Sequence, residues 1–235
     1  MATHAMDDRQ YANKRFETAE HLRQLGHALV AHRPGPDILD HLIEIVDNVL
    51  PLIEKAPVRP DPLSFLAEPD VQRAIAEGDL SFLLARSGRT SMFEDSIVSG
   101  LANPMSIAAT YEHDGEEVVA RVILGPAFEG APGRAHGGIV AALFDETMGA
   151  VLPAIGTLAY TGSLTISYRA PTPIGEQLEF RARVVERTGR RLMLEATGVV
   201  GGTRFADAEG VFIEVSNFAR PSTISPGEPE PKSDD

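Results

Sequence analysis

Residues 131–149 read APGRAHGGIVAALFDETMG, and this stretch sets the architecture expected for the whole chain. Nearly every residue from Ile139 to Val151 is apolar, and a helix that is apolar almost all round is a buried helix. The stretch is shorter than the ~20 residues that cross a membrane, and Asp145 and Glu146 interrupt it. We therefore predict a buried helix over residues 136–152, entered from a glycine-rich loop.

Strand patterns lie on both sides of this helix. Two runs precede it, at 106–112 and 117–124, and the turn sequence HDGE separates them. Four runs follow it and are separated by glycine-containing turns; they cover residues 158–168, 177–187, 191–200 and 203–215. The order of strands, one buried helix and then more strands predicts an α+β fold in which a curved antiparallel sheet wraps the central helix.

The N-terminal part of the chain reads as helical. One helix is predicted over residues 9–32, and a second over residues 37–55 because its apolar residues recur at helical spacing. We expect Asp37 to act as the N-cap of the second helix and Pro51 to kink or end it locally. Together the two helices form a hairpin that buries its apolar stripe either on the main domain or on a second copy of the chain.

These patterns divide the chain into four parts. We predict an N-terminal helical extension over residues 1–62, a connecting segment with short helices over 63–104, and the α+β domain over 105–218. The last 17 residues, 219–235, contain four prolines and end in Ser-Asp-Asp, which is the composition of a disordered tail.

Composition excludes several classes of function. With 21 Lys and Arg against 34 Asp and Glu, the formal net charge is -13, and such an acidic field repels nucleic-acid phosphates and anionic membranes. The chain has no cysteine, which rules out disulfides, thiolate catalysis and cysteine-ligated metal centres. The first ten residues, MATHAMDDRQ, lack a secretion-signal pattern. We expect a cytoplasmic protein without nucleic-acid or membrane partners.

The residues around the start of the buried helix are the candidates for chemistry. Gly137 and Gly138 let the backbone approach a ligand closely, and the unpaired N–H groups of a helix N-terminus can bind an oxyanion. Asp145 is an acid on an otherwise apolar helix, where burial is costly unless the carboxylate is paired or used. The alternative is that Asp145 has a structural role, in which it pairs with Arg134 or with a backbone donor. Glu146 is turned by about 100° on the helix, and we expect it to be satisfied elsewhere or to face a partner.

Three features together resemble the hotdog-fold acyl-CoA thioesterases: His-Gly-Gly at 136–138, an acid nine residues after the histidine, and the strand TGSLTISYRAPTPIG at 161–175. The similarity is to the PaaI-like group, and the loop GPAFEGAPGRAHGG at 125–138 is most like the branch called thioesterase superfamily members 4 and 5. The resemblance covers residues 103–216, about half of the chain. It implies a long helix wrapped by five or six antiparallel strands, two such units paired edge to edge, and active sites between them.

The resemblance also implies roles for individual residues. Asp145 corresponds to the general base or nucleophile, and the Gly137 N–H to the donor that faces the thioester carbonyl. Thr161 corresponds to the hydroxyl that helps to place water or the carboxylate, and Ser167 to a substrate contact. Many PaaI-like enzymes carry an asparagine six residues before the histidine, where this chain has Gly130. The second oxyanion contact is therefore open, with His136 or a water as candidates.

Binding of coenzyme A requires local positive charge against the acidic background. Arg169, Arg190 and Arg191 lie on or beside strands near the proposed site, and guanidinium groups suit phosphates, although arginines in turns are usually only solvated. The four histidines on the predicted helices, His21, His27, His32 and His41, show no carboxylate spacing typical of a metal site, so we expect no metal and no cofactor. His136 is expected to orient the loop rather than to act as a base.

The resulting hypothesis is an acyl-CoA thioesterase that works as a homodimer or a dimer of dimers. A non-catalytic acyl-CoA-binding or regulatory protein on the same frame is the main alternative, since added helices can serve partner docking. A hotdog hydratase acting on enoyl-CoA is a third reading, but the Asp/His pair expected for it is not evident.

Overall fold

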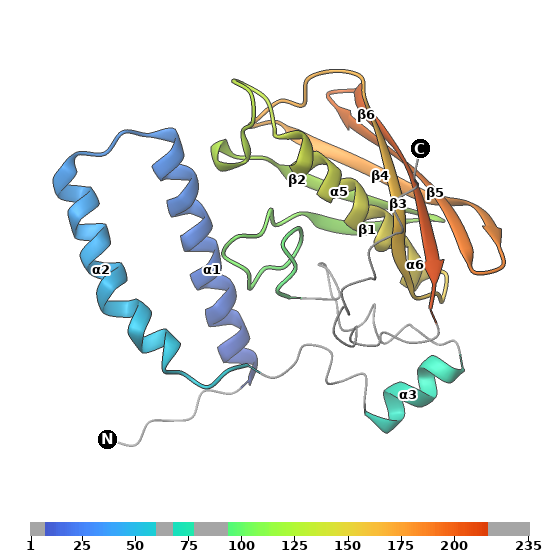
Figure 1. Cartoon of the computed structure of the whole chain (residues 1–235), viewed down its shortest axis with the longest axis horizontal. Coiled ribbons are helices and arrows are strands. Elements are labelled where there is room, and N and C mark those ends of the chain that lie inside the picture. Colours follow the sequence, from blue (N-terminus) through green and yellow to red (C-terminus); the bar gives the residue numbers. More distant parts are fainter. Residues whose placement is uncertain (1–7, 60–67, 78–93, 216–235) are drawn as a thin grey trace, which may run out of the picture.

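The computed structural model of the chain describes residues 8–59, 68–77 and 94–215. Its main body is a six-stranded antiparallel sheet in the order β1-β2-β4-β5-β6-β3 (Figure 1). The strands are β1 (Thr110–Asp114), β2 (Glu117–Ile123), β3 (Ala159–Tyr168), β4 (Gln177–Thr188), β5 (Arg191–Val200) and β6 (Thr203–Glu214). The predicted α+β class, with a sheet curved around one central helix, is therefore confirmed.

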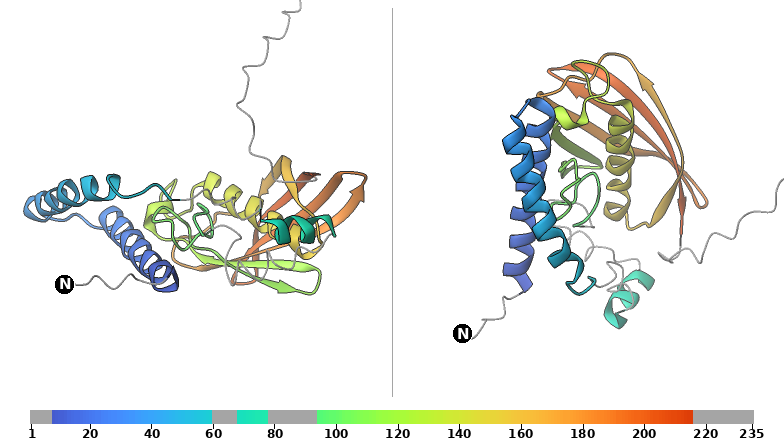
Figure 2. Two further views of the ribbon diagram at one scale, coloured as in Figure 1. Left: turned by 90° about the horizontal axis from the view of Figure 1, so that it is seen from below. Right: turned by 60° about the vertical axis from the view of Figure 1, so that its left-hand side comes forward.

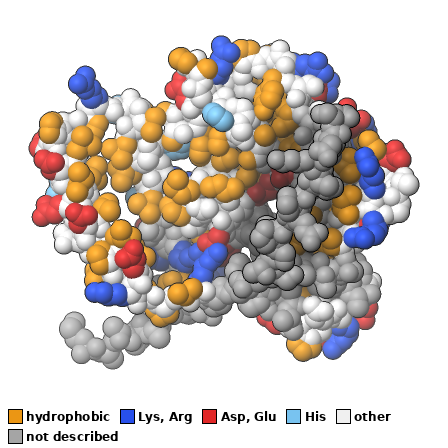
Figure 3. All heavy atoms as spheres, viewed as in Figure 1, with side chains coloured by type: hydrophobic (Ala, Val, Ile, Leu, Met, Phe, Trp, Pro, Cys, Tyr) orange, Lys and Arg blue, Asp and Glu red, His pale blue; other side chains and the backbone are white. Residues whose placement is uncertain are grey.

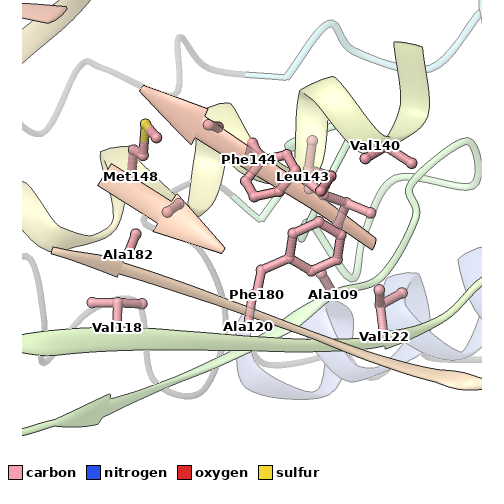
Figure 4. Packing of buried hydrophobic residues seen from close by; sticks show 14 of the residues in the cluster. Ala109, Val118, Ala120, Val122, Val140, Leu143, Phe144, Met148, Phe180 and Ala182 are labelled. Atoms are coloured by element: carbon pink, nitrogen blue, oxygen red, sulfur yellow. The ribbon is translucent and has the colours of Figure 1, made fainter. Parts of the chain in front are cut away.

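The central helix is α5 (Gly137–Gly149), which continues after a short break into α6 (Val151–Ala154). Its inner face carries Phe144, whose ring lies 4.9 Å from that of Phe180 on β4 in an edge-to-face arrangement. Figure 4 shows the side chains of α5 meeting those of the strands in a continuous apolar layer. Residues 137–154 have the length and composition of a membrane span, but they are the helical core on which the sheet packs.

Strand β3 forms one edge of the sheet. It pairs with β6 along one side, and no strand within the described residues pairs with its other side. Six of its ten residues are exposed, and a register shift at Gly162 interrupts its pairing. A long edge strand with this much exposed backbone is a ready template for pairing with another chain.

Two antiparallel helices precede the domain, α1 (Asp8–Ala31) and α2 (Pro36–Glu54). Helix α1 packs on the domain: Ala19 is buried, and the Arg15 guanidinium lies 2.6 Å from the Asp95 carboxylate. The His27 ring stacks edge-to-face on Phe128, which belongs to the 3-10 helix η2 (Pro126–Phe128). Helix α2 has no buried residue, so its apolar stripe is not covered by the described part of this chain.

Some local predictions about these elements were wrong. The N-cap of α2 is Gly35, with Pro36 at the first helical position, and Asp37 lies in the first turn. Pro51 does not end the helix, which runs on to Glu54. Proline leaves the carbonyl four residues earlier without a donor, but on an exposed helix water can supply one.

The strand predicted over residues 106–112 begins later, at Thr110. Ala108 has a φ of 59°, and the Ser106 hydroxyl accepts a hydrogen bond from its N–H at 3.0 Å. This turn is incompatible with extended backbone. In the connecting segment, α3 (Pro69–Ala76) provides one of the short helices expected there. The predicted tail over 219–235 lies outside the described residues.

Candidate active site

The last residue of the loop before α5 is a histidine that caps the helix. His136 is the N-cap of the helix, and its Nδ1 accepts a hydrogen bond from the Gly138 N–H at 3.0 Å. An accepting Nδ1 carries no proton, so the neutral ring carries its proton on Nε2. No acceptor among the described residues pairs with the Gly137 N–H. His136 therefore orients the loop, and one donor of the helix N-terminus is left for a ligand.

Tyr168 fixes the same turn from the sheet. Its hydroxyl donates a hydrogen bond of 2.7 Å to the Gly137 carbonyl oxygen, which ties the last residue of β3 to the first turn of α5. Burial raises the pKa of Tyr168, so the hydroxyl keeps the proton that it donates. Sequence reasoning assigned this residue no role, although its place at the end of the strand TGSLTISY put it beside the candidates.

Gly130 explains why the asparagine of related enzymes has no counterpart here. A Cβ atom at this position would lie 2.8 Å from the Cα atom of His136, which is closer than real Cβ contacts come. An asparagine would therefore collide with the loop in this conformation.

Asp145 lies further along α5 and faces β3. The Thr161 hydroxyl donates a hydrogen bond of 2.7 Å to its Oδ1. The Asp145 side chain is half-buried, and the partner that the structure records for it is Thr161 rather than Arg134. The second carboxylate oxygen is therefore available for a water or a substrate.

Glu146 faces the opposite side of α5. The hydroxyls of Ser96 and Ser99 both donate to its carboxylate, the first at 2.6 Å to Oε2 and the second by a short contact to Oε1. The prediction that Glu146 is satisfied elsewhere is confirmed. The two serines come from a segment without sequence periodicity, so nothing in the sequence pointed to them.

Two separate clusters result along α5. His136, Gly137 and Gly138 lie at its N-terminus with Tyr168, whereas Asp145 and Thr161 lie two turns further on. Gly137 and Asp145 are eight residues apart, which corresponds to about 12 Å along a helix. One thioester has to lie about 3 Å from both its nucleophile and its oxyanion donor. These two groups of a single chain are too far apart to act on the same bond.

A hollow of about 340 Å³ lies beside the N-terminal cluster, lined by residues 134–135, 137, 140 and 168–172. Arg134 and Arg169 are in its wall, and the Arg169 guanidinium also pairs with Asp207 at 2.9 Å. Ser167 is next to Tyr168 on β3, and since neighbouring strand residues point to opposite faces, its side chain lies on the outer face. Ser167 therefore does not join the cluster at Gly137 within one chain.

The other two arginines predicted to bind CoA, Arg190 and Arg191, lie at the end of the sheet away from Gly137. Arg190 donates from Nε to the Glu214 carbonyl at 3.0 Å, and Arg191 pairs in register with Ile213. Ile213 in turn pairs with Tyr160, next to Thr161, so this turn is nearer to Asp145 than to Gly137. Within the described residues, no group of His, Asp and Glu side chains is arranged to hold a metal ion.

The central helix, the wrapped antiparallel sheet and the glycine-rich entry loop define a hotdog domain. Residues 132–204 match the family described as the Thioesterase superfamily. A solved structure of a thioesterase superfamily protein superposes with a TM-score of 0.69 at 23% identity, covering 85% of this chain and 90% of that one. Because the hotdog domain is only about half of the chain, the shared fold extends into the helical part.

Curated relatives match the same domain. Acyl-coenzyme A thioesterase THEM5 of Mus musculus is 34% identical over 93 residues, which is 39% of this chain and 38% of the relative. Acyl-coenzyme A thioesterase THEM4 of Bos taurus is 29% identical over 93 residues, with the same coverage. The chain thus matches little more than a third of the length of these relatives. The resemblance to hotdog thioesterases of the member 4 and 5 branch is confirmed.

Proposed function

We propose that this protein hydrolyses acyl-CoA thioesters in a site built from two copies of the chain. The observation that carries the proposal is the division of the candidate machinery along α5. Asp145 is held by Thr161 at one end, and the free Gly137 N–H is held beside Tyr168 at the other, about 12 Å away. The curated relatives that match this domain are acyl-coenzyme A thioesterases.

Pairing of two copies through the edge strand β3 would bring the Asp145 end of one α5 close to the Gly137 end of the other. Thr161 contacts the acid and Tyr168 contacts the glycine loop, and both lie on this strand. If two copies pair antiparallel through β3 with the twofold axis at Thr165, Thr161 of one copy lies opposite Tyr168 of the other, because the register shift leaves Gly162 without a partner position. Asp145 then approaches the Gly137 N–H across the axis. Exposed edge backbone favours such pairing.

In this arrangement the two groups divide the reaction. The Asp145 carboxylate removes a proton from a water that attacks the thioester carbon, or it attacks the carbon itself. The Gly137 N–H, at the positive end of the α5 dipole, stabilises the negative charge that develops on the carbonyl oxygen. With water as the nucleophile, the CoA thiolate leaves, takes up a proton and the free acid remains. With Asp145 as the nucleophile, the thiolate leaves a mixed anhydride on Asp145, which a water then hydrolyses to the free acid. Thr161 keeps the carboxylate oriented throughout.

A thiol-release assay on short, medium, long and aromatic acyl-CoAs tests the proposal. Wild-type protein should release CoA, and Asp145→Asn should reduce turnover by about 10²–10⁴-fold, the range for loss of a general base. Glu209→Gln, the same chemical change at an exposed position on β6, is the control and should keep full turnover. If Asp145→Asn retains wild-type turnover, Asp145 is not the base. Binding of acyl-CoA by the wild type without any thiol release would instead support the non-catalytic alternative.

A further inference from the structure

Helix α2 divides lengthwise into two halves. At about 100° per residue, its large apolar side chains fall within one half of the circumference and its polar side chains within the other. We call the exposed apolar half the α2 stripe; it comprises Ile38, Leu39, Ile43, Ile45, Val46, Val49, Leu50, Leu52 and Ile53. Each of these side chains is between 41% and 67% exposed. A helix this amphipathic normally has its apolar half covered.

The charge of the opposite half excludes a lipid surface as the cover. Four acidic residues and a terminal glutamate lie on α2, and the helix carries neither lysine nor arginine. Helices that lie on membranes place basic residues on their polar face. The α2 stripe is therefore suited to a protein surface.

Helix α2 lies on the same side of the molecule as the edge strand. In the left panel of Figure 2, α2, α5 and β3 lie along the upper side, whereas β1 and β2 lie below them. Figure 3 shows hydrophobic side chains gathered over the two N-terminal helices and continuing across the middle of the same face. A second copy that pairs with β3 thus approaches the face that carries the stripe.

The exposed area of the stripe matches what a stable protein interface needs. Covering these nine half-exposed aliphatic side chains completely removes on the order of 800 Å² of mostly apolar surface. A stable interface removes roughly 800 Å² from each partner. The stripe is therefore as large as one side of a stable interface, and it extends the interface that the open edge of β3 offers to a second copy.

We propose that the α2 stripe docks on the second copy of this chain that pairs through β3, so that the two helical hairpins clasp the dimer. The inference rests on the two-chain arrangement of the proposed function. It gives the N-terminal extension a role in assembly rather than in chemistry.

The test uses the full chain, which contains no cysteine, so that one introduced cysteine carries one label. Ile43→Cys places an environment-sensitive fluorophore at the border of the stripe, and Asn48→Cys places it on the polar half. On dilution through the dimer dissociation range, the label at 43 should shift to the red as the dimer separates, and the label at 48 should not change. A shift at neither position would overturn the proposal. A blue-shifted label at 43 at every concentration would also overturn it, because the chain would then cover its own stripe.

A pair of double variants tests the contribution to assembly. Val46→Asp with Val49→Asp puts two carboxylates in the stripe, and His41→Asp with Asn48→Asp puts two on the polar half. We expect the first to raise the dimer dissociation constant at least tenfold and the second to change it less than threefold, with circular dichroism showing that both fold. Equal dissociation constants would contradict docking. Thiol release by the wild type is measured in parallel, so that a hydrolysis failure is told apart from a docking failure.

Discussion

Asp145 and Glu146 are adjacent in sequence, yet α5 presents them to opposite surroundings. Glu146 is enclosed by its own chain and accepts from the Ser96 and Ser99 hydroxyls. Asp145 faces an edge strand and has a single recorded partner, the Thr161 hydroxyl. One side of the helix is complete within one chain, whereas the other side is left open toward whatever covers β3. The carboxylate in the closed surroundings serves stability, and the one in the open surroundings is placed for chemistry.

The largest effect on stability should come from the closed side. Glu146→Ala leaves the buried Ser99 hydroxyl and the partly buried Ser96 hydroxyl without their acceptor, and we expect it to lower the free energy of unfolding by about 2–3 kcal/mol. Burial, and then the charge of Glu146, raises the pKa of Tyr111 well above its ordinary value, so this pocket contains no second negative group in competition. Thermal unfolding measures the change, with the exposed Glu209→Ala expected within about 0.5 kcal/mol of wild type.

The turnover of the folded Glu146→Ala protein is measured alongside its stability. Glu146→Ala should stay within about tenfold of wild type, far from the loss expected for Asp145→Asn. If Glu146→Ala abolished hydrolysis without destabilising the protein, the assignment of the two carboxylates would be reversed.

A second prediction concerns the open side. Thr165 is exposed on β3, at the expected twofold axis. Thr165→Asp should bring two carboxylates close together across the axis and raise the dimer dissociation constant about thirtyfold at low salt, with partial recovery at high salt. Thr165→Asn is the matched control, because asparagine has nearly the shape of aspartate without its charge, and it should dimerise nearly as wild type. Sedimentation equilibrium distinguishes the two. An unchanged dimer in Thr165→Asp would mean that the copies do not meet at this part of β3.

The smallest expected effect is a pH dependence at the contact between α1 and the domain. Partial burial, and then the charge of Arg23, lowers the pKa of His27, whose Nδ1 accepts from the Ala127 N–H at 3.1 Å. The unfolded chain therefore binds a proton at a higher pH than the folded one, and this contribution to stability is present above pH ~6.5 and is lost as the pH falls toward the folded pKa. The protection factors of the α1 amides, which correct for the intrinsic exchange rate at each pH, should fall from pH 7 to pH 5, and His27→Gln should lose most of that pH dependence. Equal pH dependence in the two proteins would exclude His27 as its source.

The sequence predicted the fold well where periodicity is local. The four strands after α5 and both N-terminal helices begin and end within about two residues of their predicted bounds, because alternation and helical spacing are properties of short segments. The position of Asp145 on the open side followed from the motif. What could not be predicted depends on contacts distant in sequence: the serines on Glu146, the Tyr168 hydroxyl on Gly137, and the collision that keeps position 130 a glycine. The sequence also could not predict that no residue of α2 is buried. An amphipathic pattern predicts that a helix has an apolar face, but not which surface packs against that face.

Complementation between two inactive variants tests the two-chain site most directly. Asp145→Asn removes the acid, and Gly137→Val crowds the loop, where even a Cβ would lie 3.3 Å from the Tyr168 hydroxyl. If each site takes its acid from one copy and its donor from the other, a mixed dimer contains one intact site. Equal amounts of the two inactive proteins, dissociated and reassociated at random, should then recover about a quarter of wild-type thiol release. Recovery of no activity from mixed dimers that demonstrably form would contradict a site shared between two chains.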